Sequence, residues 1–175
     1  MRKNEVVQIM EIEIGTDANC YLSGEVTGAG TKEVALSDCR GGVYGFFIEF
    51  KNEKELKSFK KKVGKKKYIK ENVLGEWRPA IGKYYPLYWG KDINLGARLK
   101  AHTKSFKSTY TIQMNRRTEL KDHKIIFGAM LCNDYDKIEK NLHDEYPDIY
   151  KTTCSTDAGE ADYNVELSNK ESNYI

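Results

Sequence analysis

The residues best suited to chemistry lie close together between Tyr84 and His102. Tyr88 and Lys91 lie on either side of a glycine, and Arg98 precedes His102 by four positions. Side chains four apart share one face of a helix, so the guanidinium and the imidazole are expected to be neighbours. A phenol, an ammonium, a guanidinium and an imidazole near one corner form a set of hydrogen-bond donors suited to an anion such as a phosphodiester.

A strand followed by a helix would position these side chains. Residues 87–89 are bulky and favour a strand, and Pro86 suits the start of that strand. Gly90 interrupts the run. Asp92 or Asn94 can then cap a helix that carries the arginine and the histidine. The sequence therefore predicts a tight corner between a strand and a helix, with the four donors close to it.

The spacing of these residues resembles the signature of the GIY-YIG nucleases. Three short segments and a single residue within residues 88–102 resemble the second half of that signature: Tyr88-Trp89-Gly90-Lys91, Asn94-Leu95, Arg98-Leu99 and His102. The first half has a counterpart in Gly42-Val43-Tyr44, and the resemblance covers residues 42–146. The family commonly separates its two tyrosine motifs by a short hairpin, whereas this chain carries an insertion between them.

The resemblance implies the hydrolysis of phosphodiester bonds and gives each matching residue a role. Tyr44 would orient or deprotonate the attacking water, and Tyr88 would lie in the same hydrogen-bond network. Arg98 would clamp the phosphate, and His102 would lie near the water. Lys91 follows the glycine directly and would contact a phosphate.

The resemblance also implies a metal site. Glu139 resembles the glutamate that holds a divalent metal, because residues 138–142 resemble the family's late Glu-x-x-Leu helix. One carboxylate with several waters fits a single Mg²⁺ or Mn²⁺ ion per active site. Glu145 is a rival ligand. The last family element is an asparagine beyond this helix, for which Asn164 is the nearest candidate, since Asn141 lies inside the helix.

Each of these residues also has an interpretation without chemistry. The two tyrosines would then be core aromatic residues with satisfied hydroxyls, and the arginine would pair with a surface carboxylate. His102 would face solvent from its helix, and Lys91 and Glu139 would be surface charges. The joint agreement of the offsets favours the functional interpretation. His123 and His143 match no motif, and we read both as structural.

The composition predicts a soluble protein. At 175 residues, one compact domain with additions is expected, and a hydrophobic share of 39% can form its core. No apolar run approaches the length that spans a membrane, and no secretory apolar segment follows the first residues. The cysteines are widely spread without a CxxC pair, which favours reduced thiols over a zinc site. We therefore expect a cytoplasmic protein without a membrane partner.

The net charge of +3 is unevenly distributed along the chain. Residues 1–40 and the tail beyond residue 151 are acidic, and the positive excess lies between residues 51 and 83. This distribution fits a phosphate-binding face and fits equally the solvated surface of a lysine-rich helix. The first interpretation makes eight basic residues candidate DNA contacts: Lys65, Lys66, Lys67, Arg78, Lys83, Lys104, Arg116 and Arg117.

The order of the predicted elements indicates an α+β fold. Apolar residues alternate with glutamates near the N-terminus, so residues 6–14 are expected to form a half-buried strand, with residues 20–22 as its hairpin partner. Three further strands are predicted at residues 43–50, 109–114 and 124–132. Helices are predicted at three places: from the Asn52 capping box to Gly64, after Asn94, and from Asp134 to Pro147.

This order predicts a small, mostly antiparallel sheet flanked by helices, as in the core that the resemblance implies. We expect a single domain over residues 1–175. Its parts would be an N-terminal β extension (1–40), a core (41–150) with the basic insertion (51–83), and an acidic polar tail (151–175).

Together with the resemblance, these features predict a metal-dependent endonuclease that acts on double-stranded DNA. The size suits a type II restriction enzyme, in which the insertion and the N-terminal extension would read the sequence. A palindromic target would imply a homodimer. Two alternatives stay open, namely a structure-selective or weakly specific nuclease for repair or defence and a non-catalytic nucleic-acid-binding module on the same fold.

Overall fold

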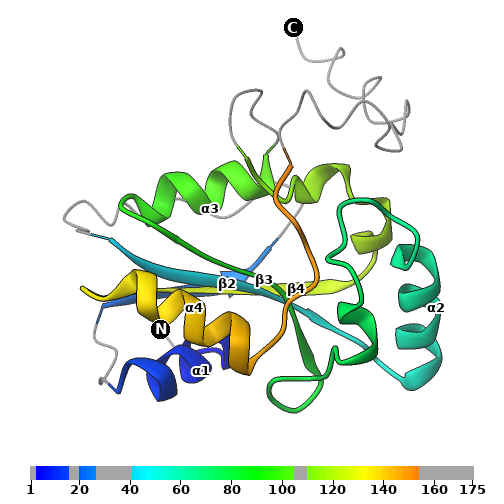
Figure 1. Ribbon diagram of the computed structural model, residues 1–175, viewed down its shortest axis with the longest axis horizontal. Coiled ribbons are helices and arrows are strands. Elements are labelled where there is room, and N and C mark those ends of the chain that lie inside the picture. The colour runs from blue at the N-terminus through cyan, green and yellow to red at the C-terminus, as the bar shows by residue number, and fades with distance from the viewer. Residues whose placement is uncertain (1–2, 16–19, 27–40, 105–109, 154–175) are drawn as a thin grey trace, which may run out of the picture.

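Four antiparallel strands in the described part of the chain form one sheet, and helices cover both of its faces (Figure 1). The computed structural model describes residues 3–15, 20–26, 41–104 and 110–153. In their order across the sheet, the strands are β1 (Tyr21–Glu25), β4 (Lys124–Leu131), β2 (Gly42–Glu49) and β3 (Tyr84–Asp92). The fold is therefore α+β, as the sequence predicted.

Strand β2 lies inside the sheet and pairs with β4 on one side and with β3 on the other. Tyr44 lies opposite Gly90, and Phe46 lies opposite Tyr88. Residues two apart on a strand point to the same face of the sheet. Tyr44 and Tyr88 therefore share one face, and the missing side chain of Gly90 leaves space between them.

Short polar side chains cap most of the helices. Asn4, Asn52 and Asn94 each accept a hydrogen bond from a backbone N–H in the first turn of the helix that follows. The helices are α1 (Glu5–Ile14), α2 (Glu53–Val63), α3 (Leu95–Thr103) and α4 (Tyr135–Glu145), with short 3₁₀ turns η1 (Val73–Gly75), η2 (Met114–Arg116) and η3 (Thr118–Leu120). None of these described helices is long and apolar enough to cross a membrane.

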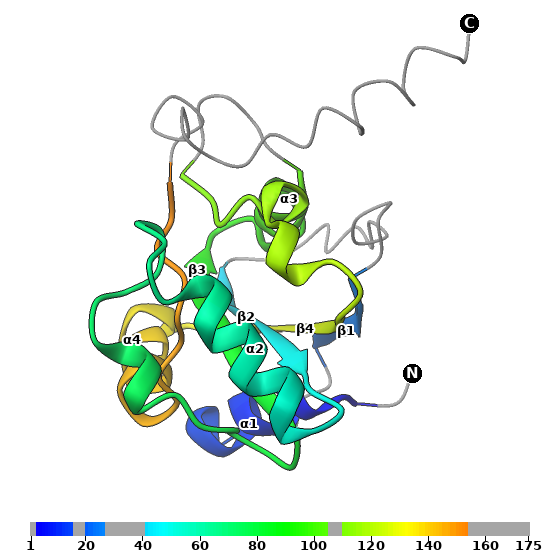
Figure 2. The same cartoon turned by 90° about the vertical axis from the view of Figure 1, so that its right-hand side faces the viewer.

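Each face of the sheet has its own hydrophobic layer. Val43, Phe47 and Trp89 pack with buried residues of α1 and α4 on one face. Tyr44 and Phe46 pack with buried residues of α2 and α3 on the other face. In Figure 2, α3 lies above the sheet, α1 lies below it, and α4 lies to the left of the strands. The helix with the predicted arginine and histidine therefore covers the face that carries Tyr44.

The strand predicted at residues 6–14 is wrong, because this segment is helix α1. Its buried residues follow a helical spacing: Val6, Val7, Ile9 and Met10. Ile12, which the strand interpretation required to be buried, is 70% exposed. Strand β1 consequently pairs with β4 and forms no hairpin with this segment. The described part of residues 1–40 is thus a helix and a strand rather than a β extension.

The strand predicted at residues 109–114 is also wrong over its described part. Residues 110–114 are irregular, with one isolated bridge between Thr111 and Thr153. Gln113 adopts a left-handed φ of 51°, which interrupts an extended chain, and η2 begins at the next residue. Residue 109 lies outside the described residues. The other predicted strands and helices are confirmed, with ends that differ by up to about three residues.

Candidate active site

Tyr44 lies at the centre of the predicted corner and is wholly buried. Its hydroxyl is directly beside the backbone of Gly90. A Cβ atom at position 90 would overlap that hydroxyl and would lie 2.8 Å from a ring carbon of Tyr88. Glycine is therefore required at this position for the two tyrosine rings to approach each other.

His102 donates a hydrogen bond to Tyr44 and is fully buried, so it does not face solvent. Its Nε2 atom lies 2.7 Å from the Tyr44 Oη atom, and the backbone N–H of Ile112 donates to its Nδ1 atom at 3.1 Å. Because Nδ1 accepts a bond, the proton of the neutral ring is on Nε2 and points at the tyrosine. Burial, helped by the charge of Arg98, lowers the pKa of His102 well below its usual value, so the ring is neutral.

Arg98 makes a second contact with the same tyrosine oxygen. Its Nε atom donates to Tyr44 Oη at 3.4 Å, and a terminal nitrogen donates to the carbonyl oxygen of Tyr110 at 2.7 Å. The carboxylate of Asp92 lies 3.8 Å from Nε. The side chain keeps 21% of its surface exposed, so an anion from solvent can reach it.

The hydrogen bonds of the corner run in one direction. The Tyr44 oxygen accepts hydrogen bonds from His102 and Arg98. The hydroxyl proton of Tyr44 is therefore free to be donated to Tyr88. Burial raises the pKa of Tyr88 to about 12, and a hydrogen bond with Tyr44 is among the smaller effects that lower it. Burial raises the pKa of Tyr44 well above its usual value, more than Arg98 lowers it. Both phenols are therefore protonated near neutral pH.

Tyr88 connects this corner to helix α4. Its ring centre lies 4.9 Å from the imidazole centre of His102 and 6.5 Å from that of His143. The tyrosine is half-buried, and its strand β3 is at the edge of the described sheet, so α4 can pack beside it. Tyr88 is thus the more accessible end of the hydrogen-bond chain.

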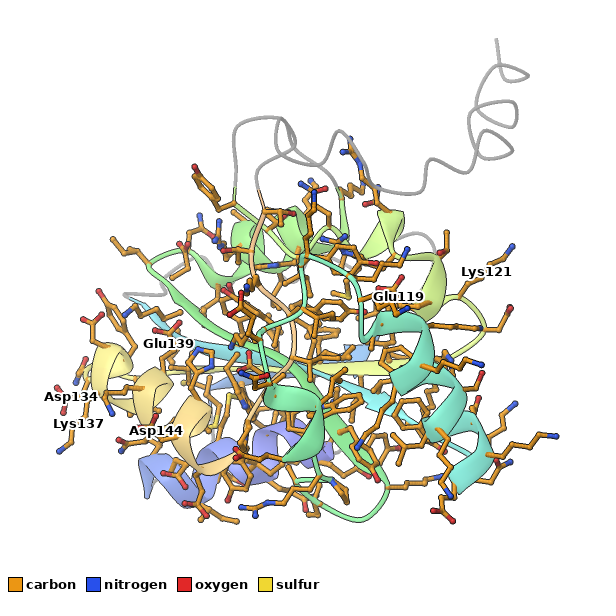
Figure 3. All side chains as sticks on the ribbon, turned by 45° about the vertical axis from the view of Figure 1, so that its right-hand side comes forward. Glu119, Lys121, Asp134, Lys137, Glu139 and Asp144 are labelled. Atoms are coloured by element: carbon orange, nitrogen blue, oxygen red, sulfur yellow. The ribbon has the colours of Figure 1, made fainter. Side chains whose placement is uncertain are left out.

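Glu139 lies on the inner side of α4, whereas Lys137 lies on its outer side (Figure 3). One Glu139 carboxylate oxygen is 3.0 Å from the ammonium of Lys91, which also pairs with Asp136 at 2.6 Å. The hydrogen bonds to Asp136 and Glu139 raise the pKa of Lys91. Lys91, the predicted phosphate contact, is therefore held in place by two carboxylates of α4.

Glu139 is the carboxylate best placed to hold a metal ion. Its side chain is 18% exposed, and its charge is one of those that raise the pKa of Tyr88, so the two groups are close. No group of three or more His, Cys, Asp and Glu side chains in the described ranges could hold a metal ion. A single partly buried carboxylate such as Glu139 is a ligand type that a hydrated Mg²⁺ or Mn²⁺ ion accepts. The rival Glu145 is exposed and lies near Tyr146 instead.

Asp148 is a buried charge that sequence reasoning missed, and its side chain is 2% exposed. One carboxylate oxygen accepts the backbone N–H of Trp89 at 2.9 Å. The other accepts from His143 Nδ1 at 2.7 Å and from Lys70 Nζ at 2.5 Å. Asp148 therefore ties β3, α4 and the loop after α2 together beside Tyr88. The expected asparagine, Asn164, lies outside the described residues.

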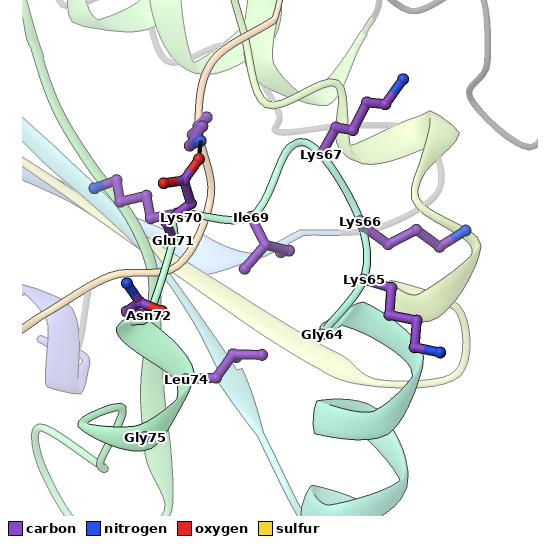
Figure 4. Close-up of a pocket in the computed structure, with 11 residues that line it drawn as sticks. Gly64, Lys65, Lys66, Lys67, Ile69, Lys70, Glu71, Asn72, Leu74 and Gly75 are labelled. Carbon is purple, nitrogen blue, oxygen red and sulfur yellow. Dashed lines mark ion pairs between the residues drawn. The ribbon is translucent and has the colours of Figure 1, made fainter.

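A hollow of about 560 Å³ adjoins this cluster (Figure 4). The charged residues among those that line it are five lysines and one glutamate: Lys65, Lys66, Lys67, Lys70, Lys151 and Glu71. The backbone N–H of Lys70 donates to Ile149, and that of Lys151 donates to Tyr68, both at 2.8 Å. These bonds fix the lysine loop (residues 64–72) against the segment after α4. Figure 4 shows the side chains of Lys65, Lys66 and Lys67 pointing away from this loop.

The remaining basic candidates differ in their surroundings. Arg78 and Lys104 are exposed. Lys83 pairs with Glu49, and Arg116 is half-buried and donates to Gln113 at 3.5 Å.

Arg117 corrects the prediction that it contacts DNA, because it is only 4% exposed. Its guanidinium donates to the carbonyl of Ile112 and to the hydroxyl of Thr153, and it lies 3.5 Å from the ring centre of Tyr68. A guanidinium that is buried and occupied in this way has a structural role.

No family model, no curated protein and no solved structure matches this chain. The case for a function therefore depends on the geometry of the corner. That geometry combines an accessible guanidinium, two protonated phenols oriented by a neutral imidazole, and a carboxylate beside the outer phenol. Such a set can bind a phosphodiester, orient a water and hold a hydrated cation.

Proposed function

We propose that this protein is a divalent-metal-dependent endonuclease that hydrolyses phosphodiester bonds of double-stranded DNA. The hydrogen-bond chain supports this proposal most directly, since neutral His102 orients Tyr44, and Arg98 donates to the same oxygen at 3.4 Å. The antiparallel pairing of the two tyrosine strands and the helix after the second agree with the core that the resemblance to GIY-YIG nucleases implies. The finer form of the proposal is a type II restriction enzyme that acts as a homodimer on a palindromic site.

Arg98 binds the scissile phosphate in this proposal. Without DNA, its guanidinium is held by the carbonyl of Tyr110 and by Asp92. A phosphate offers charged acceptors that the planar guanidinium fork can bind with two parallel hydrogen bonds. As charge builds on the phosphate oxygens in the transition state, the same contact becomes stronger and lowers the barrier.

Tyr88 rather than Tyr44 contacts the attacking water in this proposal. Tyr44 is wholly buried, whereas Tyr88 is half-buried. Because the pKa values of both phenols are raised, they donate hydrogen bonds and do not take the water's proton at neutral pH. Their role is therefore to orient the water, and neutral His102 holds Tyr44 in the direction that this requires.

Glu139 would hold a hydrated Mg²⁺ or Mn²⁺ ion beside Tyr88. A bound ion would lower the pKa of a coordinated water and offset negative charge on the phosphate. Lys91 fixes one oxygen of Glu139 at 3.0 Å and so orients the carboxylate. The other oxygen is then directed away from that ion pair.

The lysine loop supplies contacts to the DNA backbone in this proposal. Its lysines carry a local excess of positive charge, and Lys70 connects the loop to Asp148 beside the tyrosines. Lysines that neutralise phosphates release counterions, which gives affinity without sequence preference. A weakly specific repair or defence nuclease would use the same surface.

A non-catalytic DNA-binding module is the second candidate, and the complete burial of Tyr44 favours it. The variant Glu139→Gln separates the two candidates. For the nuclease, cleavage of a supercoiled plasmid should require a divalent metal, stop with a chelator and be lost in Glu139→Gln, while binding of the same DNA persists.

The matched control for this experiment is Glu145→Gln, which removes an exposed charge from the end of the same helix. It should cleave at the wild-type rate. A Glu139→Gln protein that cleaves as fast as wild type would reject Glu139 as the ligand. A wild-type protein that binds DNA without cleaving it in Mg²⁺ or Mn²⁺ would favour the binding module.

A further inference from the structure

His143 and Glu139 face each other across one turn of α4. The Nε2 atom of His143 lies 3.9 Å from the Oε1 atom of Glu139, which is too far for a direct hydrogen bond. Glu139 uses its other oxygen, Oε2, for the ion pair with Lys91. The Nε2 and Oε1 atoms therefore face each other on one side of α4, and the centre of the His143 ring lies 6.5 Å from that of the Tyr88 ring.

Asp148 determines which nitrogen of His143 carries a proton. The Nδ1 atom lies 2.7 Å from a carboxylate oxygen of Asp148, which can only accept, so Nδ1 is the donor. In the neutral ring, the lone pair is then on Nε2, on the side that faces Glu139. Asp148 is itself fixed by the backbone N–H of Trp89 and by Lys70. The imidazole is thus oriented by groups from three different segments.

A histidine that donates one ring N–H to a buried carboxylate is a common arrangement at protein metal sites. The carboxylate fixes the tautomer and makes the other nitrogen a better ligand. The Glu-x-x-x-His spacing on a helix places both ligands on one face, as two ligands to one ion require. In this chain, Asp148 is the orienting carboxylate, and His143 Nε2 and Glu139 Oε1 are the two facing atoms.

We propose that His143 Nε2 is a second protein ligand of the divalent metal, beside Oε1 of Glu139. This proposal rests on the proposed function for the assignment of Glu139 as a ligand. Metal–nitrogen and metal–oxygen bonds are each about 2.0–2.2 Å long, so two ligands of one ion lie at most about 4.4 Å apart. The observed 3.9 Å satisfies that limit. Waters and the phosphate complete the coordination.

An imidazole ligand changes which metals the site prefers. Mg²⁺ prefers oxygen ligands and keeps most of its waters, whereas borderline transition metals accept imidazole nitrogen readily. A site of one carboxylate and one histidine therefore binds Mn²⁺, Co²⁺ and Zn²⁺ more tightly than Mg²⁺. The competing account is an ion pair, in which a protonated His143 only neutralises Glu139.

Electron paramagnetic resonance of bound Mn²⁺ tests the ligand directly, because a coordinated imidazole nitrogen modulates the electron spin echo. The experiment uses the full-length protein without DNA. The nitrogen modulation should be present in wild type and absent in His143→Gln. We expect His143→Gln to bind Mn²⁺ at least about tenfold more weakly, with a smaller change for Mg²⁺.

The matched control is Asp144→Asn, which removes an exposed carboxylate next to His143 that pairs with Lys140 on the outer side of α4. It should keep both the modulation and the Mn²⁺ affinity. Wild-type protein that binds Mn²⁺ without nitrogen modulation, or that binds no Mn²⁺, overturns the proposal. Cleavage supported by Mg²⁺ in that same protein would leave the proposed nuclease function intact, so the two failures are distinguishable.

Discussion

His102 determines the direction of the hydrogen bonds at the tyrosine corner. The backbone N–H of Ile112 occupies Nδ1, so Nε2–H must point at Tyr44, and Tyr44 in turn has its proton left for Tyr88. A protonated imidazole would have to donate from Nδ1 as well, which the facing N–H of Ile112 prevents. The geometry and the lowered pKa of His102 therefore agree on a neutral ring.

The buried imidazole of His102 should make the stability of the fold depend on pH. The folded-state pKa of His102 is depressed, so the unfolded chain binds a proton that the folded chain does not. Stability from His102 is thus present above the unfolded-state pKa of about 6.5 and is lost as the pH falls below it, by at most about 1.4 kcal/mol per pH unit.

Urea unfolding between pH 7.5 and pH 5 measures this effect by comparing wild type with His102→Gln. Wild type should lose more stability on acidification than the variant, because the variant has no imidazole at this position. His123, whose pKa is lowered by burial, is present in both proteins and cancels in the difference. Parallel curves for the two proteins would contradict the neutral, buried state of His102.

The sequence predicted the tyrosines, Arg98, His102 and Glu139 because their spacing resembles a known signature. It did not single out His143, which we propose as a ligand, although the spacing of four residues from Glu139 was visible on a predicted helix. Asp148 carried no such signal, since its partners come from three separate parts of the chain. A buried charge is recognised by its partners, and these are known only after folding.

At the scale of elements, the register between β2 and β3 creates the site. It places Gly90 directly opposite Tyr44, where any Cβ would overlap the phenol hydroxyl. A shift of β3 by one residue against β2 would move Tyr88 to the face covered by α1 and α4 and separate it from Tyr44. The corner therefore depends on strand pairing before it depends on any side-chain contact.

Gly90→Ala tests this dependence. The added methyl group should displace the Tyr44 hydroxyl from His102 and Arg98, lower the free energy of unfolding by about 1–3 kcal/mol, and abolish cleavage. Gly75→Ala is the control, because a Cβ there has no neighbour within 4 Å. It should change stability by less than about 1 kcal/mol and leave cleavage unchanged. Equal effects of the two substitutions on urea unfolding would reject the packing argument.

Helix α1 shows why one element was predicted wrongly. Alternation of apolar residues and glutamates from Met10 to Ile14 suggested a strand, but the window was short. The preceding Val6, Val7 and Ile9 extend the buried set with a helical period, and Asn4 caps the first turn at Val7 N. Ile12 faces outward, so the alternating residues were not all buried. The pattern of burial over a longer stretch of sequence decides between a helix and a strand, and a short alternating segment does not report it.

At the scale of the whole molecule, the lysine loop adjoins the tyrosine corner. Backbone hydrogen bonds attach this loop to residues 149–151, and that segment donates in turn to Leu87 of β3. The arrangement joins a basic surface from the insertion to the strand that carries Tyr88. DNA bound across both would place its backbone charge on the lysines and one phosphate at Arg98.

Replacing Lys65, Lys66 and Lys67 together with Ala tests the lysine loop. Each phosphate contact that is lost should reduce the slope of log K against log salt concentration by about 0.9. The control replaces three exposed α2 lysines, Lys54, Lys57 and Lys61, and so removes the same charge elsewhere. A DNA-binding titration at several salt concentrations measures both slopes. If the control flattens the slope as much as the loop variant does, the effect is one of net charge alone.

The central claim is that the tyrosine corner stabilises a phosphodiester transition state. Arg98→Lys tests it, because lysine keeps the charge but cannot form the same paired contacts. Single-turnover cleavage and binding of uncleaved DNA are measured on one duplex, with the exposed Arg78→Lys as control. We predict that Arg98→Lys slows cleavage on the order of a hundredfold or more and changes binding far less, while Arg78→Lys changes neither. Equal losses of binding and cleavage would make Arg98 a docking contact, and wild-type cleavage by Arg98→Lys would contradict the assignment of this corner as the active centre.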